Sequence, residues 1–116
     1  GRQAMVELAR IYIYTYSSEE KQNMALRLLE QVIANKDEDL SSAAQAQYLL
    51  GEYWARQGEF EKAKQAFLTA STMNPRDRDH TAKSMFRVAE MAKKSGDLTA
   101  AQVMLDKEKA NFSDTE

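Results

Sequence analysis

The 116-residue chain has no cysteine, one proline, one histidine and four glycines. Without cysteine it can form neither a disulfide framework nor a thiolate metal site, and one histidine leaves little from which to build a zinc site. No apolar run approaches the roughly 20 residues of a membrane-spanning helix. The 16 basic and 18 acidic residues give a net charge of −2, so the chain lacks the positive field that nucleic acid or an anionic membrane surface requires.

The residues that dominate the chain are strong helix formers. Ala, Leu, Met, Gln, Glu and Lys are abundant, and few Gly or Pro residues interrupt them. Apolar residues recur at helical spacing in six segments, which predicts helices at about 3–16, 17–35, 41–57, 60–73, 80–95 and 97–112. The sequence therefore predicts an all-α fold.

Particular residues mark where these helices begin and end. Ser17 and Glu20 have the spacing of a capping box, in which the Ser side chain accepts a backbone hydrogen bond and the Glu side chain reaches back. Gly58 breaks the pattern after the third predicted helix. Gly96 can adopt the left-handed conformation that ends a helix, and Asp97 can cap the sixth helix.

A specific pattern of small, aromatic and turn residues covers the third and fourth predicted helices. On a 34-residue frame that starts at Ala44, its members in chain order are Leu50, Gly51, Trp54, Gly58, Ala63, Phe67, Ala70 and Pro75. This pattern resembles a tetratricopeptide repeat. Gln47 departs from it, since the family usually has a large aromatic residue there, and we expect Gln47 to be partly exposed at the edge of the stack.

The spacing of this pattern has a physical reason. Gly51 and Ala63 have almost no side chain, so the two helices of a hairpin can cross closely. Trp54 and Phe67 fill the space on either side. Pro75 ends the second helix, because the residue before a proline is pushed out of the helical region.

The flanking segments match the same frame more weakly, through small residues such as Ala9, Ala25, Ala89 and Ala101. The resemblance implies a single domain that is a right-handed solenoid of about three antiparallel helix hairpins, with repeat-like units at about 2–38, 44–77 and 82–115. Its stretched connections are similar to those of bacterial envelope proteins, such as the coordinator of the Tol–Pal system and lipoprotein subunits of outer-membrane assembly machines. Gly1 is interpreted as a cloning scar, so we expect a fragment without its targeting segment, from the bacterial periplasm or envelope or from the cytoplasm.

The chain offers no arrangement of residues that predicts catalysis. His80 is expected to be a solvated residue at a helix start, not a base or a ligand. Asp37 and Asp39 resemble the start of a calcium loop, but Ser42 and Tyr48 stand where that loop needs Gly and Glu. We therefore expect no enzyme activity, no cofactor and no metal ion.

The resemblance implies instead that the chain binds a protein or peptide on a concave face made by the first helix of each hairpin. The candidate partner-binding residues are Arg10, Tyr14, Tyr48, Glu52, Arg56, Phe86, Glu90 and Lys93, and Val6, Ile13, Ala55, Lys83 and Lys94 are expected on the same face. Aromatic residues beside Arg are typical of such interfaces. We expect a peptide with apolar anchors and some acidic character.

Two alternatives remain open at this point. Tyr48 and Phe86 can belong either to the partner surface or to the core between repeats, whereas Tyr12, Trp54 and Phe67 are assigned to the core. The chain can also be a self-associating scaffold whose ends stack between copies, because it has no polar capping helix of the kind that keeps solenoids soluble.

Overall fold

The computed structural model describes residues 1–96. Five helices make up this part of the chain: α1 (Arg2–Thr15), α2 (Glu19–Ala34), α3 (Leu40–Arg56), α4 (Phe60–Met73) and α5 (Arg78–Lys94). No strand occurs between residues 1 and 96, so the predicted all-α class is confirmed for this range. The sixth predicted helix, from about residue 97, and the end of the third repeat-like unit lie outside it.

Side-chain caps fix where three of the helices begin. Ser18 caps α2 by accepting a hydrogen bond from the backbone N–H of Lys21 at 3.3 Å. The prediction that Ser17 caps this helix is wrong by one residue, because the chain is still extended at Ser18. Asp39 caps α3. Asp77 caps α5, which therefore starts two residues before the predicted start at His80.

Two glycines end helices in the left-handed region of backbone space. Gly58 follows α3 with φ of 78°, and Gly96 follows α5 with φ of 99°. Residues with a Cβ rarely adopt such angles. The predicted break at Gly58 and the predicted left-handed conformation of Gly96 are both confirmed.

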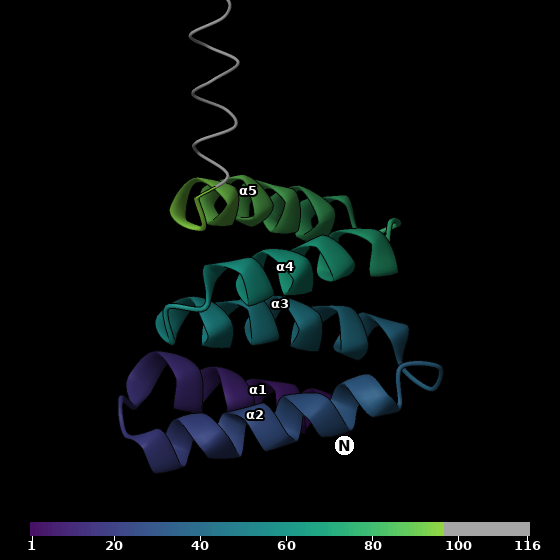
Figure 1. Cartoon of the computed structure of the whole chain (residues 1–116). Coiled ribbons are helices and arrows are strands. Elements are labelled where there is room, and N and C mark those ends of the chain that lie inside the picture. The colour runs from purple at the N-terminus through teal and green to yellow at the C-terminus, as the bar shows by residue number, and fades with distance from the viewer. Residues whose placement is uncertain (97–116) are drawn as a thin grey trace, which may run out of the picture.

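The five helices form two layers. Each helix packs against the next one along the chain, and in addition α1 contacts α3 and α3 contacts α5. Among these helices, α2 and α4 do not contact each other. Figure 1 shows the resulting stack, with α1 and α2 at one end and α5 at the other. Segments more than 30 residues apart in sequence, on α1, α3 and α5, are therefore brought side by side.

The buried side chains form two clusters. The first joins α1, α2 and α3 through Val6, Ala9, Ile13, Ala25, Leu29, Val32, Ala46, Leu49 and Tyr53, and the second joins α4 to α5 through Ala63, Phe67 and Met91. Trp54 packs against both clusters. Phe67 is fully buried, whereas Tyr12 and Trp54 are partly buried. The expectation that Val6 and Ile13 face a partner is wrong, because both side chains point into the first cluster.

Gly51 allows α3 and α4 to approach closely. A Cβ atom built on Gly51 would lie 2.6 Å from a ring carbon of Phe67. That separation is far shorter than ordinary van der Waals contact, which begins near 3.5 Å. The Phe67 ring therefore occupies the space that any side chain at Gly51 would need.

This contact predicts the effect of replacing Gly51 by Ala. In an exposed helix Ala would stabilise by about 1 kcal/mol relative to Gly, but overpacking a core costs about 1–3 kcal/mol. We expect Gly51→Ala to lower the free energy of unfolding by up to about 2 kcal/mol in urea titrations, because the fully buried ring has little room to move. In a Phe67→Leu background the same change should be neutral or stabilising. A stabilising Gly51→Ala in the unmodified chain would contradict the close approach.

Candidate partner-binding surface

The candidate residues come together where α1, α3 and α5 lie side by side. We call this surface the α1–α3–α5 face. Its members are Arg10 and Tyr14 on α1, Tyr48, Glu52 and Arg56 on α3, and Lys83, Arg87 and Glu90 on α5. The guanidinium of Arg56 lies 4.9 Å from the ring centre of Tyr14, which joins α3 to α1. Glu52 and Arg87 join α3 to α5.

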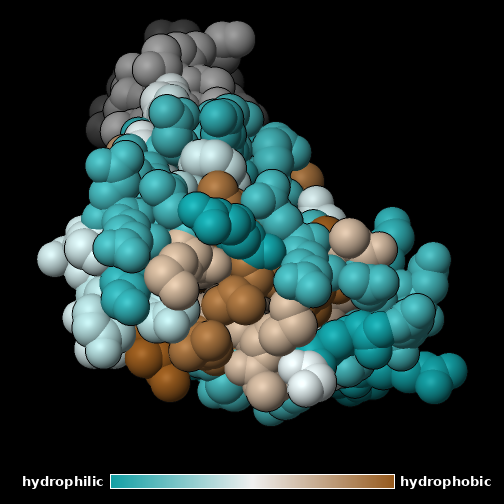
Figure 2. Space-filling view, turned by 90° about the horizontal axis from the view of Figure 1, so that it is seen from below, coloured by the Kyte–Doolittle hydropathy of each residue, from teal (hydrophilic) through white to brown (hydrophobic). Residues whose placement is uncertain are grey.

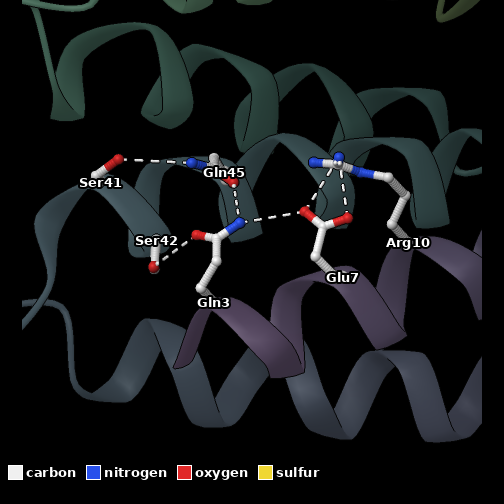
Figure 3. Close-up of polar contacts among 6 residues, drawn as sticks. All are labelled: Gln3, Glu7, Arg10, Ser41, Ser42 and Gln45. Atoms are coloured by element: carbon white, nitrogen blue, oxygen red, sulfur yellow. Dashed lines mark hydrogen bonds and ion pairs between the residues drawn. The ribbon is translucent and has the colours of Figure 1, made fainter. Parts of the chain in front are cut away.

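A chain of polar side chains fixes the start of α1 against the start of α3 (Figure 3). The amide nitrogen of Gln3 donates to Glu7 at 3.1 Å and to the amide oxygen of Gln45 at 3.2 Å, and its oxygen accepts from the Ser42 hydroxyl at 3.2 Å. Glu7 also pairs with Arg10 at 3.3 Å. Arg10 is thus held by a carboxylate of its own helix.

Arg87 is the centre of an ion-pair network that the sequence did not predict. Its Nε lies 2.7 Å from the carboxylate of Glu52, and its Nη1 lies 2.9 Å from that of Glu90. The guanidinium also stands 5.0 Å from the ring centre of Phe67. Glu52 is only 9% exposed, so the structure places this candidate residue in an internal pair. The three-residue spacing from Arg87 to Glu90 was the one signal in the sequence for this network.

Tyr48 belongs to both the core and the surface. Its half-buried ring meets the ring of Phe67 edge-on, with 5.1 Å between centres. The ammonium group of Lys83 lies 4.2 Å from the centre of the same ring. Burial, followed by the charge of Glu52, raises the pKa of the Tyr48 hydroxyl. The ring therefore supports the core and also holds a cation at the surface.

Tyr14 and Arg56 line a hollow of about 330 Å³ at one end of this face. Burial raises the pKa of Tyr14 to about 12, and the negative charge of Glu52 contributes to the increase. Gln22 closes the hollow from α2. Its buried amide nitrogen donates to the carbonyls of Tyr12, Ile13 and Tyr16 at 3.1, 3.3 and 2.5 Å and so satisfies the end of α1. The sequence did not predict that Gln22 would be buried against the end of α1, because its neighbours in the chain are polar.

His80 is not the solvated residue that the sequence suggested. It is 9% exposed, and its ring centre lies 6.0 Å from that of Tyr48. Its Nε2 atom is buried without a hydrogen-bond partner. The expectation failed because the residues before His80 are charged, whereas the first turn of α5 packs His80 inward. Together with Arg10, Gln45, Asp77, Asp79 and Lys83 it lines a second hollow, of about 360 Å³.

The buried position of His80 predicts a pH-dependent stability. Burial lowers its pKa below the ordinary value of 6.5, although Asp77 opposes the change. As the pH falls through 6.5, the unfolded chain binds a proton that the folded chain does not bind, so the folded state loses stability. We expect the free energy of unfolding to decrease between about pH 7 and pH 5. In His80→Gln the decrease over this range should be smaller, and equal pH profiles for the two proteins would contradict the buried neutral imidazole.

Phe86 and Lys93 lie away from the contacts between α3 and α5. Phe86 is 66% exposed, more than any other large apolar residue between positions 1 and 96. Successive side chains are rotated by about 100° around a helix, and Arg87, not Phe86, meets α3. The expected line of Tyr14, Tyr48 and Phe86 is therefore interrupted at α5, where Lys83 and Arg87 take the position next to Tyr48.

Another apolar surface lies at the end of the stack formed by α1 and α2. Figure 2 views the molecule from this end and shows apolar side chains gathered there. Leu8 and Ile11 are exposed on α1. A hollow of about 210 Å³ beside them is lined by Leu8, Tyr12, Met24, Arg27, Leu28 and Gln31. Arg27 is the one charged residue among those of positions 1–96 that line this hollow.

Within residues 1–96, no three His, Asp or Glu side chains lie close enough together to hold a metal ion. None of the five helices combines the length and the apolar character that crossing a bilayer requires.

Comparison of the chain with protein-family models, curated proteins and solved structures finds no match.

Proposed function

We propose that the chain is a non-catalytic module that binds a protein or peptide partner on the α1–α3–α5 face and so helps to assemble a larger complex. The observation that carries this proposal is the pairing of cations with partly exposed aromatic rings across helix boundaries, Arg56 on Tyr14 and Lys83 on Tyr48. Tyrosine and arginine are among the residues most often responsible for binding energy at protein interfaces.

The proposed architecture is a right-handed solenoid of the tetratricopeptide type. Two features support it: the close approach at Gly51 and Phe67, and the alternation of helices between two layers. In such a solenoid the layer of α1, α3 and α5 would line the concave face. Hollows at both ends of that layer, near Arg56 and near Lys83, would give an elongated partner room for side chains.

A selection from random peptides tests this function for any partner that binds through a short segment. Phage-displayed 12-residue peptides would be selected on the immobilised full chain, and their affinities measured for the unmodified protein, Tyr14→Ala and the control Leu68→Ala. Leu68 is exposed on α4, outside the proposed surface. We expect Tyr14→Ala to weaken binding on the order of tenfold, with no effect of Leu68→Ala. Equal affinities for all three proteins would contradict the proposal.

The second candidate function is a self-associating scaffold. The apolar end surface around Leu8 and Ile11 favours it, because contiguous exposed apolar surface marks interaction sites. Light scattering over a concentration series tests this candidate. A mass that rises with concentration and returns to that of one chain in Ile11→Lys would support it, and one chain at every concentration would remove it.

A further inference from the structure

The positive charges of the α1–α3–α5 face are of two kinds. Arg10 pairs with Glu7, and Arg87 pairs with both Glu52 and Glu90. Arg56 and Lys83 have no carboxylate within ion-pair distance among residues 1–96; each lies over a tyrosine ring instead. Both are exposed. The face therefore holds two accessible positive charges that no carboxylate among residues 1–96 neutralises, although the whole chain has a net charge of −2.

Among the residues that the structure describes, the hollow beside Arg56 also contains no carboxylate that could neutralise it. No acidic residue lines its hollow, where the other side chains are Ile13, Tyr14, Thr15, Tyr16, Ser17, Gln22 and Gln57. Stacking on the Tyr14 ring leaves the edge of the guanidinium free to make two parallel hydrogen bonds to a carboxylate. Because the ring already orients the cation, less side-chain entropy is lost when a carboxylate binds.

Lys83 offers a second point for a negative charge. Its ammonium group lies over the Tyr48 ring and beside the hollow that Asp77 and Asp79 also line. Asp77 is already engaged, since its carboxylate accepts the backbone N–H of His80 at 3.0 Å. Lys83 forms an ion pair with neither Asp77 nor Asp79, so its ammonium group can bind a ligand carboxylate beside the Tyr48 ring.

The positions of the two cations set a spacing. Arg56 lies eight residues beyond Tyr48 on α3, which corresponds to about 12 Å along the helix axis. The two cations also lie on opposite sides of α3, toward α1 and toward α5, so they are separated by about 9 Å across the layer. The distance between them is therefore about 15 Å, which an extended peptide covers with about four or five residues.

We propose that the occupant of the α1–α3–α5 face is an acidic segment of a partner protein in extended conformation, with two Asp or Glu side chains four or five residues apart. One carboxylate binds Arg56 beside Tyr14, and the other binds Lys83 beside Tyr48. The Glu52–Arg87–Glu90 network between them has two carboxylates and one guanidinium and so keeps one net negative charge; the acidic side chains of the segment therefore bind at Arg56 and Lys83 and not at this network. This inference rests on the proposed function, since it specifies the chemistry of the same site.

Parallel peptide selections test it. The 12-residue library would be selected on the full chain and separately on Arg56→Gln/Lys83→Gln. The control is Lys62→Gln, which removes a cation held 4.6 Å from the ring centre of Trp54 and lining a different hollow. Peptides selected on the unmodified chain should be enriched in pairs of acidic residues four or five positions apart. They should bind the double variant at least about tenfold more weakly, bind Lys62→Gln unchanged, and weaken as salt concentration rises.

The other outcomes separate the two proposals. Peptides that depend on Tyr14 but show no acidic enrichment and bind the double variant equally well would overturn this inference and leave the proposed function intact. A failure to select any peptide that depends on Tyr14 would overturn both. A 20-nucleotide oligothymidylate that displaced the acidic peptides at equal charge concentration would also overturn the inference, because it would identify a nucleic-acid surface.

Discussion

Phe67→Ala is expected to lower the free energy of unfolding by about 3–5 kcal/mol, the range for removing a fully buried aromatic ring. The ring has no exposed surface, fills the space above Gly51, meets the edge of Tyr48 and lies beneath the guanidinium of Arg87. Its loss would leave a cavity where α3, α4 and α5 meet. Urea denaturation followed by far-UV circular dichroism measures the change.

A matched control lies next to it on the same helix. Leu68 is exposed, so Leu68→Ala should change the free energy of unfolding by no more than about 0.5 kcal/mol. Hydrogen exchange adds a regional test, because the two core clusters are distinct. In Phe67→Ala the amides of α4 and α5 should lose protection before those of α1 and α2. Equal decreases in the free energy of unfolding for Phe67→Ala and Leu68→Ala would contradict the arrangement of the core.

Arg87→Ala is expected to have the second largest effect, a loss of about 3 kcal/mol in the free energy of unfolding. The variant leaves the Glu52 carboxylate largely buried without its cation and uncovers the Phe67 ring. A buried charge without a partner costs more than the pair itself contributes. The measurement is urea denaturation at pH 7.

A double-mutant cycle separates the loss of the pair from the loss of packing. Glu52→Gln removes the charge that Arg87→Ala would leave unpaired, so the double variant should be less destabilised than the sum of the two single variants, by about 1 kcal/mol or more. Additive effects would show that the 2.7 Å contact contributes nothing to stability. The same cycle with Lys93, an exposed residue of α5, in place of Arg87 should be additive.

The sequence predicted the helix boundaries best where glycine or proline ends a helix. Both ends of α4 were placed correctly because Gly58 precedes the helix and Asn74-Pro75 follows it. The close approach of α3 and α4 was predicted from the small residues Gly51 and Ala63. The structure explains this signal, because the Phe67 ring leaves no room for a side chain at Gly51. At these positions the backbone conformation or the close packing permits very few residue types. The residue type itself therefore indicates the local structure.

The candidate surface was harder to predict because polar residues are buried in α5. His80, Ser84 and Met91 occupy one stripe of this helix, and Arg87 lies within the same stripe. Only one of the four is apolar, so hydrophobic periodicity could not locate the inward face. On α1 the error was to place buried apolar residues on the surface. Val6 and Ile13 were placed on the partner surface, although the buried stripe that meets α2 and α3 includes them. Both errors arose because the inward face of a helix depends on which neighbours it packs against.

The most direct measurement of the central claim is paramagnetic relaxation enhancement from a nitroxide attached to a peptide selected on the unmodified chain. With the ¹⁵N-labelled protein, the proposal predicts that amide signals broaden most strongly along α1, α3 and α5, around Tyr14, Tyr48 and Lys83, and less on α2 and α4, which lie in the layer behind them. Broadening that is strongest on α2 and α4, or at the apolar end around Leu8 and Ile11, would contradict it.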